Sequence, residues 1–461
     1  MSAAAAATSG MRVRFWGTRG SIAKPGPGTV RYGGNTSCVE VRAEDGTLIV
    51  LDCGTGAHAL GQSLLAGPQP VRGHLLITHT HWDHIQGFPF FVPLFVPGNE
   101  WDVYAPTGLG RRLEDTLAGQ MEYAYFPVTL DQLGATIRYH EIVEGAFDVG
   151  PVRVVARYLN HPALALGYRL EAGGLSVVYA TDHEPHATPA TGGPRAGAHP
   201  PAHLEDQRHR EFIAGADLVI HDAQYTLAEY GRKVGWGHCP AEYVVDAALA
   251  AGVRRLALFH HDPLRDDDGL DRLVAASRER AATAARPLDV FGAAEGALIE
   301  LTPRAKPAPR PAAAPGEAAE PAAIADAARD RQAVVLIVDD DEDIVHMLTM
   351  ALWTEGFLVR SASDGEAALA LARAEPPDLL LLDWRLPGRD GLAVCRALRA
   401  DADPRLRDLP VVLLTGYAGD DDTAAGFAAG VTDYVTKPFS PAHIRSRVHT
   451  WLLRRRAGAG G

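Results

Sequence analysis

The sequence predicts an α/β protein with two domains, because two different patterns share a chain that is too long for one. With 461 residues, the chain is about three times the ~150 residues of an average domain. Up to about residue 300, short apolar runs separated by Gly/Pro-rich turns often end in His or Asp. After residue 330, five strand-like runs alternate strictly with five helical runs. This second pattern is typical of a doubly wound parallel sheet.

A Pro/Ala-rich tract separates the two patterns. Residues 304–330 combine prolines, alanines and balanced charges with almost no large apolar side chain. Such a tract cannot form a core and is expected to be an extended spacer. We therefore predict a first domain over residues 11–303, a linker over 304–330 and a second domain over 331–456.

The composition is that of a globular protein, with 47% apolar and 22% charged residues. The net charge of -13 argues against nucleic acid and anionic membranes as partners. The four cysteines form no CxxC pair, so neither a disulfide framework nor a Cys-based zinc site is expected. The start of the chain lacks signal-peptide features, and the longest apolar segment, 88–96, is interrupted by prolines. These features predict a cytoplasmic location.

Strand-like runs predict the framework of the first domain. They cover residues 11–17, 47–54, 74–79, 152–159, 175–182, 217–223 and 255–261. Polar residues at several of their ends indicate a site at one edge of a sheet. The Pro/Gly/Ala-rich stretch 183–203 is predicted to be a surface loop, and its His183 and His186 are not expected to be ligands.

The second domain alternates between the two kinds of element. Strands are predicted at 333–340, 357–363, 378–384, 410–416 and 432–438, and helices at 343–356, 364–375, 391–400, 421–430 and 440–456. In a parallel sheet, the carboxyl ends of all these strands meet at one edge.

Acidic and polar residues gather at that edge of the second domain. Asp339 and Asp340 end the first strand, Asp383 the third, Thr415 the fourth, and Lys437 follows the fifth. Clustered carboxylates repel one another unless a divalent cation neutralises them, so we expect Mg²⁺ at Asp339, Asp340 and Asp383. Asp383 would then attack phosphorus as a nucleophile, and Thr415 and Lys437 would hold the phosphoryl oxygens.

Four motifs of the second domain occur together: VDD, DWRLPGRDG around Asp383, LLTG with Thr415, and TDYVTKPF with Tyr434 and Lys437. In this combination, residues 334–453 resemble the receiver domain of bacterial two-component response regulators. The resemblance implies a flavodoxin-like (βα)5 fold. It also implies phosphorylation of Asp383 by a histidine kinase or phosphotransfer protein, with Thr415, Tyr434 and Lys437 as switch residues.

The segment HLLITHTHWDHIQG places four candidate metal ligands directly after a predicted strand: His79, His81, Asp83 and His84. Alternation along an extended chain makes His79 and His81 point the same way. The loop that follows turns Asp83 and His84 toward a second position. This stretch of six residues thus supplies four ligands for two adjacent metal ions.

Further candidate ligands end other predicted strands. They are His161, Asp182 and either His260 or His261. A single histidine is usually a packed core residue, but this many at strand ends indicate a metal site. Zn²⁺ suits such nitrogen and oxygen ligands best, with Mn²⁺ or Fe as alternatives.

HTHWDH corresponds to an H-x-H-x-D-H signature, and residues 11–301 resemble the metallo-β-lactamase fold, an αββα sandwich with a dinuclear metal site. The resemblance implies that one metal ion binds His79, His81 and His161, and the other Asp83, His84 and His260, with Asp182 bridging both. His260 is preferred over His261 because LALFH aligns with the strand-plus-His pattern of that fold.

Within that superfamily, two segments resemble the branch of ribonuclease Z and cyclic-nucleotide phosphodiesterases. DLVIHDAQYT is similar to its H-E-A-T segment, with Asp222 where Glu is usual, and GWGHCPAEYVV is similar to its H-S-T segment. This likeness places His238 at the proton-transfer position, oriented by Asp222. Together with Asp83 at the metals, these are the predicted catalytic residues.

The function predicted from these sites is hydrolysis of a small phosphodiester such as a cyclic nucleotide, with Arg19 as a positive group for the substrate and control by phosphorylation of Asp383. No long basic insertion for gripping structured RNA is present. Two alternatives stay open. The same metals would also activate water toward a lactone, thioester or other ester, and the chain would serve as a non-catalytic phosphorelay adaptor if the metal fold were only a scaffold. A homodimer is also left open.

Overall fold

The computed structural model describes residues 10–107, 111–186, 204–284, 286–303, 332–416, 426, 429–437, 439 and 441–458. The chain divides into two compact units. One comprises Met1–His161, Ala165–Thr191 and Arg208–Ala325, and the other Pro162–Leu164, Gly192–Gln207 and Asp326–Gly461. The predicted linker over 304–330 lies outside the described residues.

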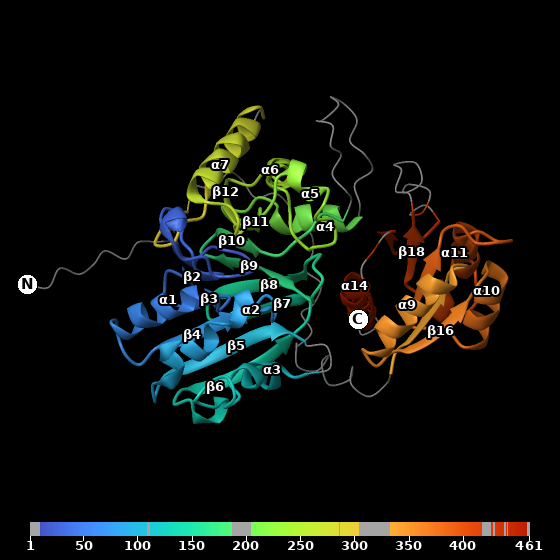
Figure 1. Cartoon of the computed structure of the whole chain (residues 1–461), viewed down its shortest axis with the longest axis horizontal. Coiled ribbons are helices and arrows are strands. Elements are labelled where there is room, and N and C mark those ends of the chain that lie inside the picture. Colours follow the sequence, from blue (N-terminus) through green and yellow to red (C-terminus); the bar gives the residue numbers. More distant parts are fainter. Residues whose placement is uncertain are drawn as a thin grey trace, which may run out of the picture. The chain divides into compact units, whose positions relative to one another are not determined.

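Two seven-stranded sheets form the framework of the first unit (Figure 1). The first sheet has the order β14-β1-β2-β3-β4-β5-β6. Its strands are β1 (Met11–Gly17), β2 (Cys38–Arg42), β3 (Leu48–Leu51), β4 (Arg72–Leu76), β5 (Glu100–Pro106), β6 (Thr136–Ile142) and β14 (Leu298–Leu301). Strands β3 to β6 pair in parallel, so their carboxyl ends share one edge.

The second sheet repeats this plan with the order β13-β12-β11-β10-β9-β8-β7. Its strands are β7 (Gly145–Val149), β8 (Val152–Tyr158), β9 (Leu166–Ala172), β10 (Leu175–Ala180), β11 (Leu218–Asp222), β12 (Arg255–Phe259) and β13 (Asp289–Gly292). Strands β10 to β13 are parallel. Each sheet therefore brings several strand ends to the region where the predicted ligands stand.

The two sheets pack face to face, and helices cover their outer faces. Between the sheets, the Tyr168 hydroxyl donates to the carbonyl of Ile77 at 2.7 Å, and the rings of Phe15 and Phe259 lie 6.2 Å apart. Helix α1 (Gly56–Leu65) and helix α3 (Leu113–Gln120) pack on the first sheet. Helix α6 (Ala241–Ala250) and helix α7 (Asp267–Ala282) pack on the second. The result is the predicted αββα sandwich.

The remaining helices of this unit are short, apart from α4. They are α2 (Trp82–Ile85), α4 (Leu204–Ile213) and α5 (Leu227–Tyr230), with 3₁₀ turns at Pro27–Thr29, Phe88–Phe90, Val92–Phe95 and Leu130–Gln132. Among the described residues, no helix is both long and apolar enough to span a bilayer.

The second unit is a five-stranded parallel sheet of order β16-β15-β17-β18-β19. Its strands are β15 (Val334–Val338), β16 (Leu358–Ala362), β17 (Leu379–Asp383), β18 (Val411–Thr415) and β19 (Asp433–Thr436). The described helices are α9 (Glu342–Trp353), α10 (Gly365–Ala374), α11 (Gly391–Arg399), α12 (Pro404–Arg407) and α14 (Pro441–Gly458). This is the predicted doubly wound fold, although most of the helix predicted at 421–430 lies outside the described residues.

Aspartates start several helices of this unit, which explains why the sequence marks their boundaries clearly. The carboxylate of Asp341 accepts from the backbone of Asp343 at 3.0 Å, and that of Asp390 accepts from Ala393 at 2.7 Å. Asp364 does the same at α10. An N-terminal cap of this kind stabilises a helix by about 1 kcal/mol.

The predicted strands of the first unit are confirmed, but about half of its strands were not predicted. Strands β5, β6, β7 and β9 are among those missed. Several of these carry charged residues and lie toward the ends of their sheets, where one face is partly exposed, as along β6. Their hydrophobic signal is therefore weaker than that of the central strands.

Candidate functional site

Four candidate ligands come from the chain between the end of β4 and helix α2. Beyond β4, the chain crosses to α2, where His81 is the N-cap residue and Asp83 and His84 lie inside the helix. His79, Asp83 and His84 are buried, whereas His81 is exposed. The motif HTHWDH thus turns from an extended segment into a helix within six residues, and this turn gives the ligands two directions.

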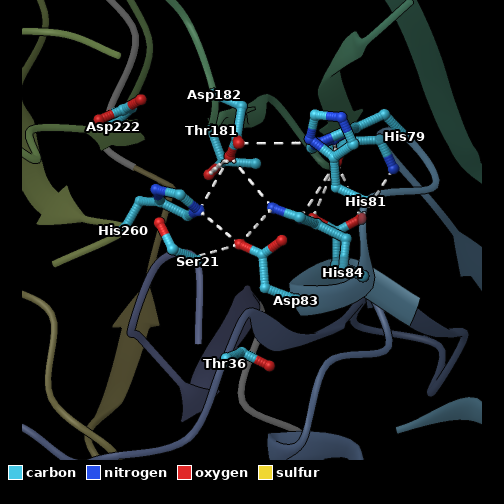
Figure 2. A network of polar contacts seen from close by, with 12 residues as sticks. Ser21, Thr36, His79, His81, Asp83, His84, Thr181, Asp182, Asp222 and His260 are labelled. Carbon is cyan, nitrogen blue, oxygen red and sulfur yellow. Dashed lines mark hydrogen bonds and ion pairs between the residues drawn. The ribbon is translucent and has the colours of Figure 1, made fainter. Parts of the chain in front are cut away.

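The first predicted ligand group comes together at one side of Asp182 (Figure 2). His161 Nε2 lies 3.1 Å from His81 Nδ1. The Oδ2 atom of Asp182 lies 3.6 Å from His79 Nε2 and 3.7 Å from His161 Nε2. One ligand atom from each of these four residues falls within 4.8 Å of the others, which is the spacing that one metal ion requires.

The second predicted group comes together at the other oxygen of the same carboxylate. Asp182 Oδ1 lies 3.2 Å from His84 Nε2 and 3.1 Å from His260 Nε2. Asp83 Oδ2 lies 3.3 Å from His84 Nε2 and 3.1 Å from His260 Nε2. Asp182 therefore lies between the two groups, as a bridging ligand would. The structure brings together all seven residues, and their metal ligation stays a prediction.

The donor atoms of this cluster fit a pair of metal ions. Within the described part of the chain, Nε2 of His79 is buried and has no hydrogen-bond partner, which is costly unless another group occupies it. Burial lowers the pKa of His79 well below its ordinary value and that of His161 to about 3, so both imidazoles are neutral and able to ligate.

His84 differs in its charge. Burial disfavours its charged form, but the carboxylates of Asp182, Asp83 and Asp52 outweigh burial and raise the pKa of His84 well above its ordinary value. A cation at this group would therefore displace a proton.

Asp52 contacts His84 on the ring nitrogen that faces away from the ligand group. Its Oδ2 pairs with His84 Nδ1 at 2.7 Å and accepts from the Tyr179 hydroxyl at 2.8 Å. Its Oδ1 accepts from the backbone of Thr78 at 2.7 Å. Because a carboxylate at Nδ1 directs Nε2 toward the metal, Asp52 fixes both the tautomer and the orientation of His84.

Backbone strain concentrates at this site. Among the described residues, four that are not glycine have φ in the left-handed region: Ser21 at 64°, Asp52 at 60°, Asp182 at 55° and His260 at 56°. Each such residue costs on the order of 1–3 kcal/mol. The Ser21 backbone N–H donates to Asp83 Oδ2 at 2.7 Å, so all four contribute to the candidate site.

Two glycines allow the chain to close tightly around the site. A Cβ on Gly20 would lie 2.4 Å from the His260 ring, and a Cβ on Gly87 would lie 1.9 Å from the carbonyl of Gly54. Side chains at either position would push His260 or the ligand segment out of the candidate site.

The geometry distinguishes His260 from His261. His260 lies in the second ligand group, whereas His261 turns away and its Nε2 lies 2.8 Å from the carbonyl of Ala293. Burial lowers the pKa of His261 to about 3. His261 is therefore a packed core histidine, and His260 is the one that faces Asp83 and Asp182.

His238 and Asp222 form a pair beside the metal groups. His238 Nδ1 lies 2.7 Å from Asp222 Oδ2, so Asp reaches the imidazole although it is one methylene shorter than Glu. Burial lowers the pKa of His238, but the charge of Asp222 and the hydrogen bond with it raise that pKa to about 9. The imidazole packs on His260 with ring centroids 4.9 Å apart. A protonated imidazole thus stands next to the candidate metals.

Two expectations about other residues of this unit were wrong. Arg19 is fully buried, and its guanidinium donates to the carbonyls of Gly33, Asp262 and Arg265, so it ties loops together and cannot meet a substrate. The stretch 183–203 does not begin at the surface, because His183 is 1% exposed and stacks on His209 with ring centroids 3.9 Å apart. Residues 187–203 lie outside the described part of the chain.

One residue near the site was missed by the sequence analysis. Glu184 is buried, and its carboxylate accepts from the backbone N–H groups of Gly235 and Gly237, each at 2.7 Å. It therefore fixes the chain just before His238. A single glutamate in a loop carries no sequence signal for such a contact, because its partners lie about 50 residues away along the chain.

The acidic site of the second unit has the predicted arrangement. Asp339, Asp340 and Asp383 place one oxygen each within 4.8 Å of the others. Lys437 Nζ lies 2.7 Å from Asp339 Oδ2 and 2.5 Å from Asp383 Oδ1. Burial raises the pKa of Asp339. Burial also disfavours the charged form of Lys437, but the hydrogen bonds with Asp339 and Asp383 outweigh it and raise the pKa of the lysine. Thr415 ends β18, and Tyr434 lies half-buried in β19.

Comparison with known families agrees with this division. Residues 47–261 match the model of the beta-lactamase superfamily domain, and residues 335–449 match that of the response regulator receiver domain. The fold and the sites thus define a class of two-domain protein in which a metallo-β-lactamase-fold domain precedes a receiver domain. This chain combines one domain of each family.

Individual relatives cover only parts of the chain. The DNA-binding response regulator MtrA of Mycolicibacterium smegmatis is 43% identical over 120 residues, which are 26% of this chain and 50% of that protein. The chain thus spans about half the length of the curated relatives it matches. The metallo-β-lactamase-fold protein YhfI of Bacillus subtilis is 18% identical, with a TM-score of 0.44 over 63% of this chain and 99% of that chain. The short form of human tRNase Z is 22% identical, with a TM-score of 0.41, and the match covers 62% of this chain and 98% of that chain.

Proposed function

We propose that this chain is a metal-dependent hydrolase of small phosphodiesters, such as cyclic nucleotides, whose activity is controlled by phosphorylation of Asp383. The observation that carries the proposal is the His238–Asp222 pair, 2.7 Å apart, beside two adjacent ligand groups that share Asp182. Phosphodiester hydrolysis releases an alkoxide, which needs a proton. A metal pair and a proton donor in one site supply both halves of that reaction.

The residues divide the work as follows. His79, His81 and His161 would hold one metal ion and Asp83, His84 and His260 the other, with Asp182 between them. When bound, such a pair supplies the Lewis acidity that activates water and neutralises the phosphate charge. His238, kept protonated by Asp222, donates its proton from Nε2 to the leaving oxygen. Asp52 holds His84 in position throughout.

Zn²⁺ is the proposed metal of this site, because imidazoles outnumber carboxylates among the ligands. Mn²⁺ or Fe would satisfy the same donors. Mg²⁺ is proposed for Asp339, Asp340 and Asp383, which offer only hard oxygen ligands. The second domain would receive a phosphoryl group at Asp383 from a histidine kinase or a phosphotransfer protein, and Lys437 would bind one of its oxygens.

One experiment tests the chemistry against the alternatives. The purified protein is analysed for bound metals and then assayed side by side with a nitrophenyl phosphodiester, cyclic nucleotides, a thioester and a lactone. We expect about two zinc equivalents per chain and turnover of the phosphodiesters. Faster turnover of the thioester or lactone would show that the site hydrolyses acyl compounds and would contradict the proposed phosphodiester hydrolysis. A metal-loaded protein that is inactive on all of them would indicate an adaptor.

A further inference from the structure

The chain that precedes His238 forms a loop attached firmly to the candidate site. We name residues 231–237 the His238 loop. Glu184, which is 3% exposed, accepts from the Tyr230 hydroxyl and from the N–H groups of Gly235 and Gly237, all at 2.7 Å. On its other side, the carbonyl of Gly237 lies 3.1 Å from Nδ1 of the candidate ligand His161. The base of the loop is therefore held between a buried carboxylate and the metal site.

The same loop presents an aromatic side chain to solvent. Trp236 is 56% exposed, although it stands only two residues before the buried His238. Its neighbours Gly235 and Gly237 have φ of 85° and 84°, a backbone region open to glycine and strained for other residues. The loop thus turns at the glycines on both sides of Trp236 and leaves the indole exposed, two residues along the chain from the candidate proton donor.

A lysine lies against this indole. Lys233 Nζ is 4.0 Å from the centroid of the Trp236 ring and 5.5 Å from that of Tyr225, and Tyr225 packs edge-on against His238 with ring centroids 6.0 Å apart. Cation–π contacts of this kind fix an ammonium group in place. With Arg19 buried, Lys233 is a cation that can meet an anionic substrate near His238.

We propose that Trp236 and Lys233 form the substrate subsite on the leaving-group side of the scissile bond, and that it accepts an aromatic group, such as a nucleobase or aryl ring, attached to a phosphodiester. The inference rests on the proposed function, because His238 protonates the leaving oxygen and the leaving group must therefore lie beside it. The exposed face of Trp236 stacks the aromatic ring, and Lys233 attracts the phosphate charge. Stacking on an aromatic side chain accepts any nucleobase or aryl ring and is strong enough to select substrates that carry one.

Binding of two inert phosphodiester analogues tests this subsite without turnover. Diphenylphosphinate and dimethylphosphinate carry the same charge and have P–C bonds that cannot be hydrolysed, and calorimetry gives their Kd values for the full-length, zinc-loaded protein. We expect the wild type to bind the diphenyl compound at least about tenfold more tightly. W236A should remove that preference and leave dimethylphosphinate binding within about twofold, whereas W236F should keep most of it.

Matched variants separate the two residues and control for surface changes. K233Q should raise the Kd of both analogues by a similar factor. The difference from the wild type should become smaller at higher salt, because salt screens the charge of Lys233. Trp353, an exposed tryptophan of α9 in the second unit, provides the control, and W353A should change neither Kd. A wild type without aryl preference, or a W236A protein that keeps it, would overturn the proposal.

Turnover distinguishes failure of this inference from failure of the proposed function. If the wild type hydrolyses no phosphodiester, the proposed function is wrong, and the two Kd values still decide whether Trp236 binds aromatic groups. If the wild type hydrolyses bis(p-nitrophenyl) phosphate but W236A shows unchanged kcat/KM and unchanged aryl preference, the function stands and the subsite does not.

Discussion

At the scale of single residues, Asp222 decides what His238 can do. An imidazole buried among other histidines would lose its proton, as the lowered pKa values of His79 and His161 show. His238 has the opposite shift, because the carboxylate of Asp222 stabilises its charged form and raises its pKa to about 9. The pair is thus suited to donating a proton near neutral pH.

Replacing Asp222 with Asn is expected to remove this stabilisation and leave His238 mostly neutral. Turnover of a phosphodiester with an alkyl leaving group should fall about 10²–10⁴-fold, which is the usual contribution of a general acid. Turnover of a phosphodiester that releases p-nitrophenoxide, which leaves without protonation, should fall less than about tenfold. Steady-state kinetics with both substrates measures the difference, and equal losses would argue against proton donation.

Glu184 is expected to act as a positioning residue rather than to touch the substrate. In E184Q the amide group offers one acceptor fewer, so a buried N–H of Gly235 or Gly237 loses its partner. We expect the free energy of unfolding to fall by about 2 kcal/mol, together with a lower kcat for alkyl leaving groups and an unchanged zinc content. Denaturant unfolding and metal analysis check this, with E171Q as a control at a half-exposed glutamate paired with Arg169. An unchanged free energy of unfolding would show that these contacts contribute little.

At the scale of elements, the candidate site is a meeting of strand ends. The ligand segment follows β4, Asp182 follows β10 and His260 follows β12, and Asp52 follows β3. Three of these residues leave their strands through left-handed backbone conformations, which turn the side chains toward one another. The two sheets thus position the strand ends, and the left-handed residues at those ends orient the candidate ligands toward one another.

The shared position of Asp182 predicts a graded loss of metal. D182A removes oxygens that face both ligand groups, so we expect the zinc content to fall from about two equivalents to less than one. H260A affects only the second group and should leave about one equivalent, and H261A should leave both. Metal analysis after dialysis measures the content. If H261A lost zinc and H260A did not, the assignment of His260 would be wrong.

At the scale of the whole molecule, the chain joins a candidate hydrolase to a receiver domain. The receiver site is complete in its geometry, because Lys437 contacts both Asp339 and Asp383. Phosphorylation adds negative charge and strong acceptors at this point, which changes how a receiver surface packs. We propose that the candidate hydrolase domain on the same chain responds to that change.

Acetyl phosphate tests this coupling. We expect it, with Mg²⁺, to phosphorylate the wild type and to change its rate of phosphodiester hydrolysis, and to do neither in D383N. D408N changes an exposed aspartate of the same domain and should behave as the wild type. Phosphate-affinity gels report the modification and kinetics report the rate. Phosphorylation of Asp383 with identical rates before and after would reject control by the receiver.

The sequence by itself determined the features that repeat along the chain. The alternation after residue 330 predicted the order of strands and helices, because several helices begin at a capping aspartate and the central strands β15, β17 and β18 are continuous apolar runs. HTHWDH predicted two ligand directions, because strand and helix periodicities place side chains differently. The αββα framework followed from the family resemblance together with the buried central strands.

Only the tertiary structure decided which distant residues meet. The packing of His261 against Ala293, the burial of Arg19 and His183, and the contact of Glu184 with the His238 loop all depend on segments far apart in the chain. A side chain's charge, exposure and partner are set by what packs against it, and local sequence does not record that. The two sheets bring those segments together, and the same residue types then become a ligand, a loop anchor or a core side chain.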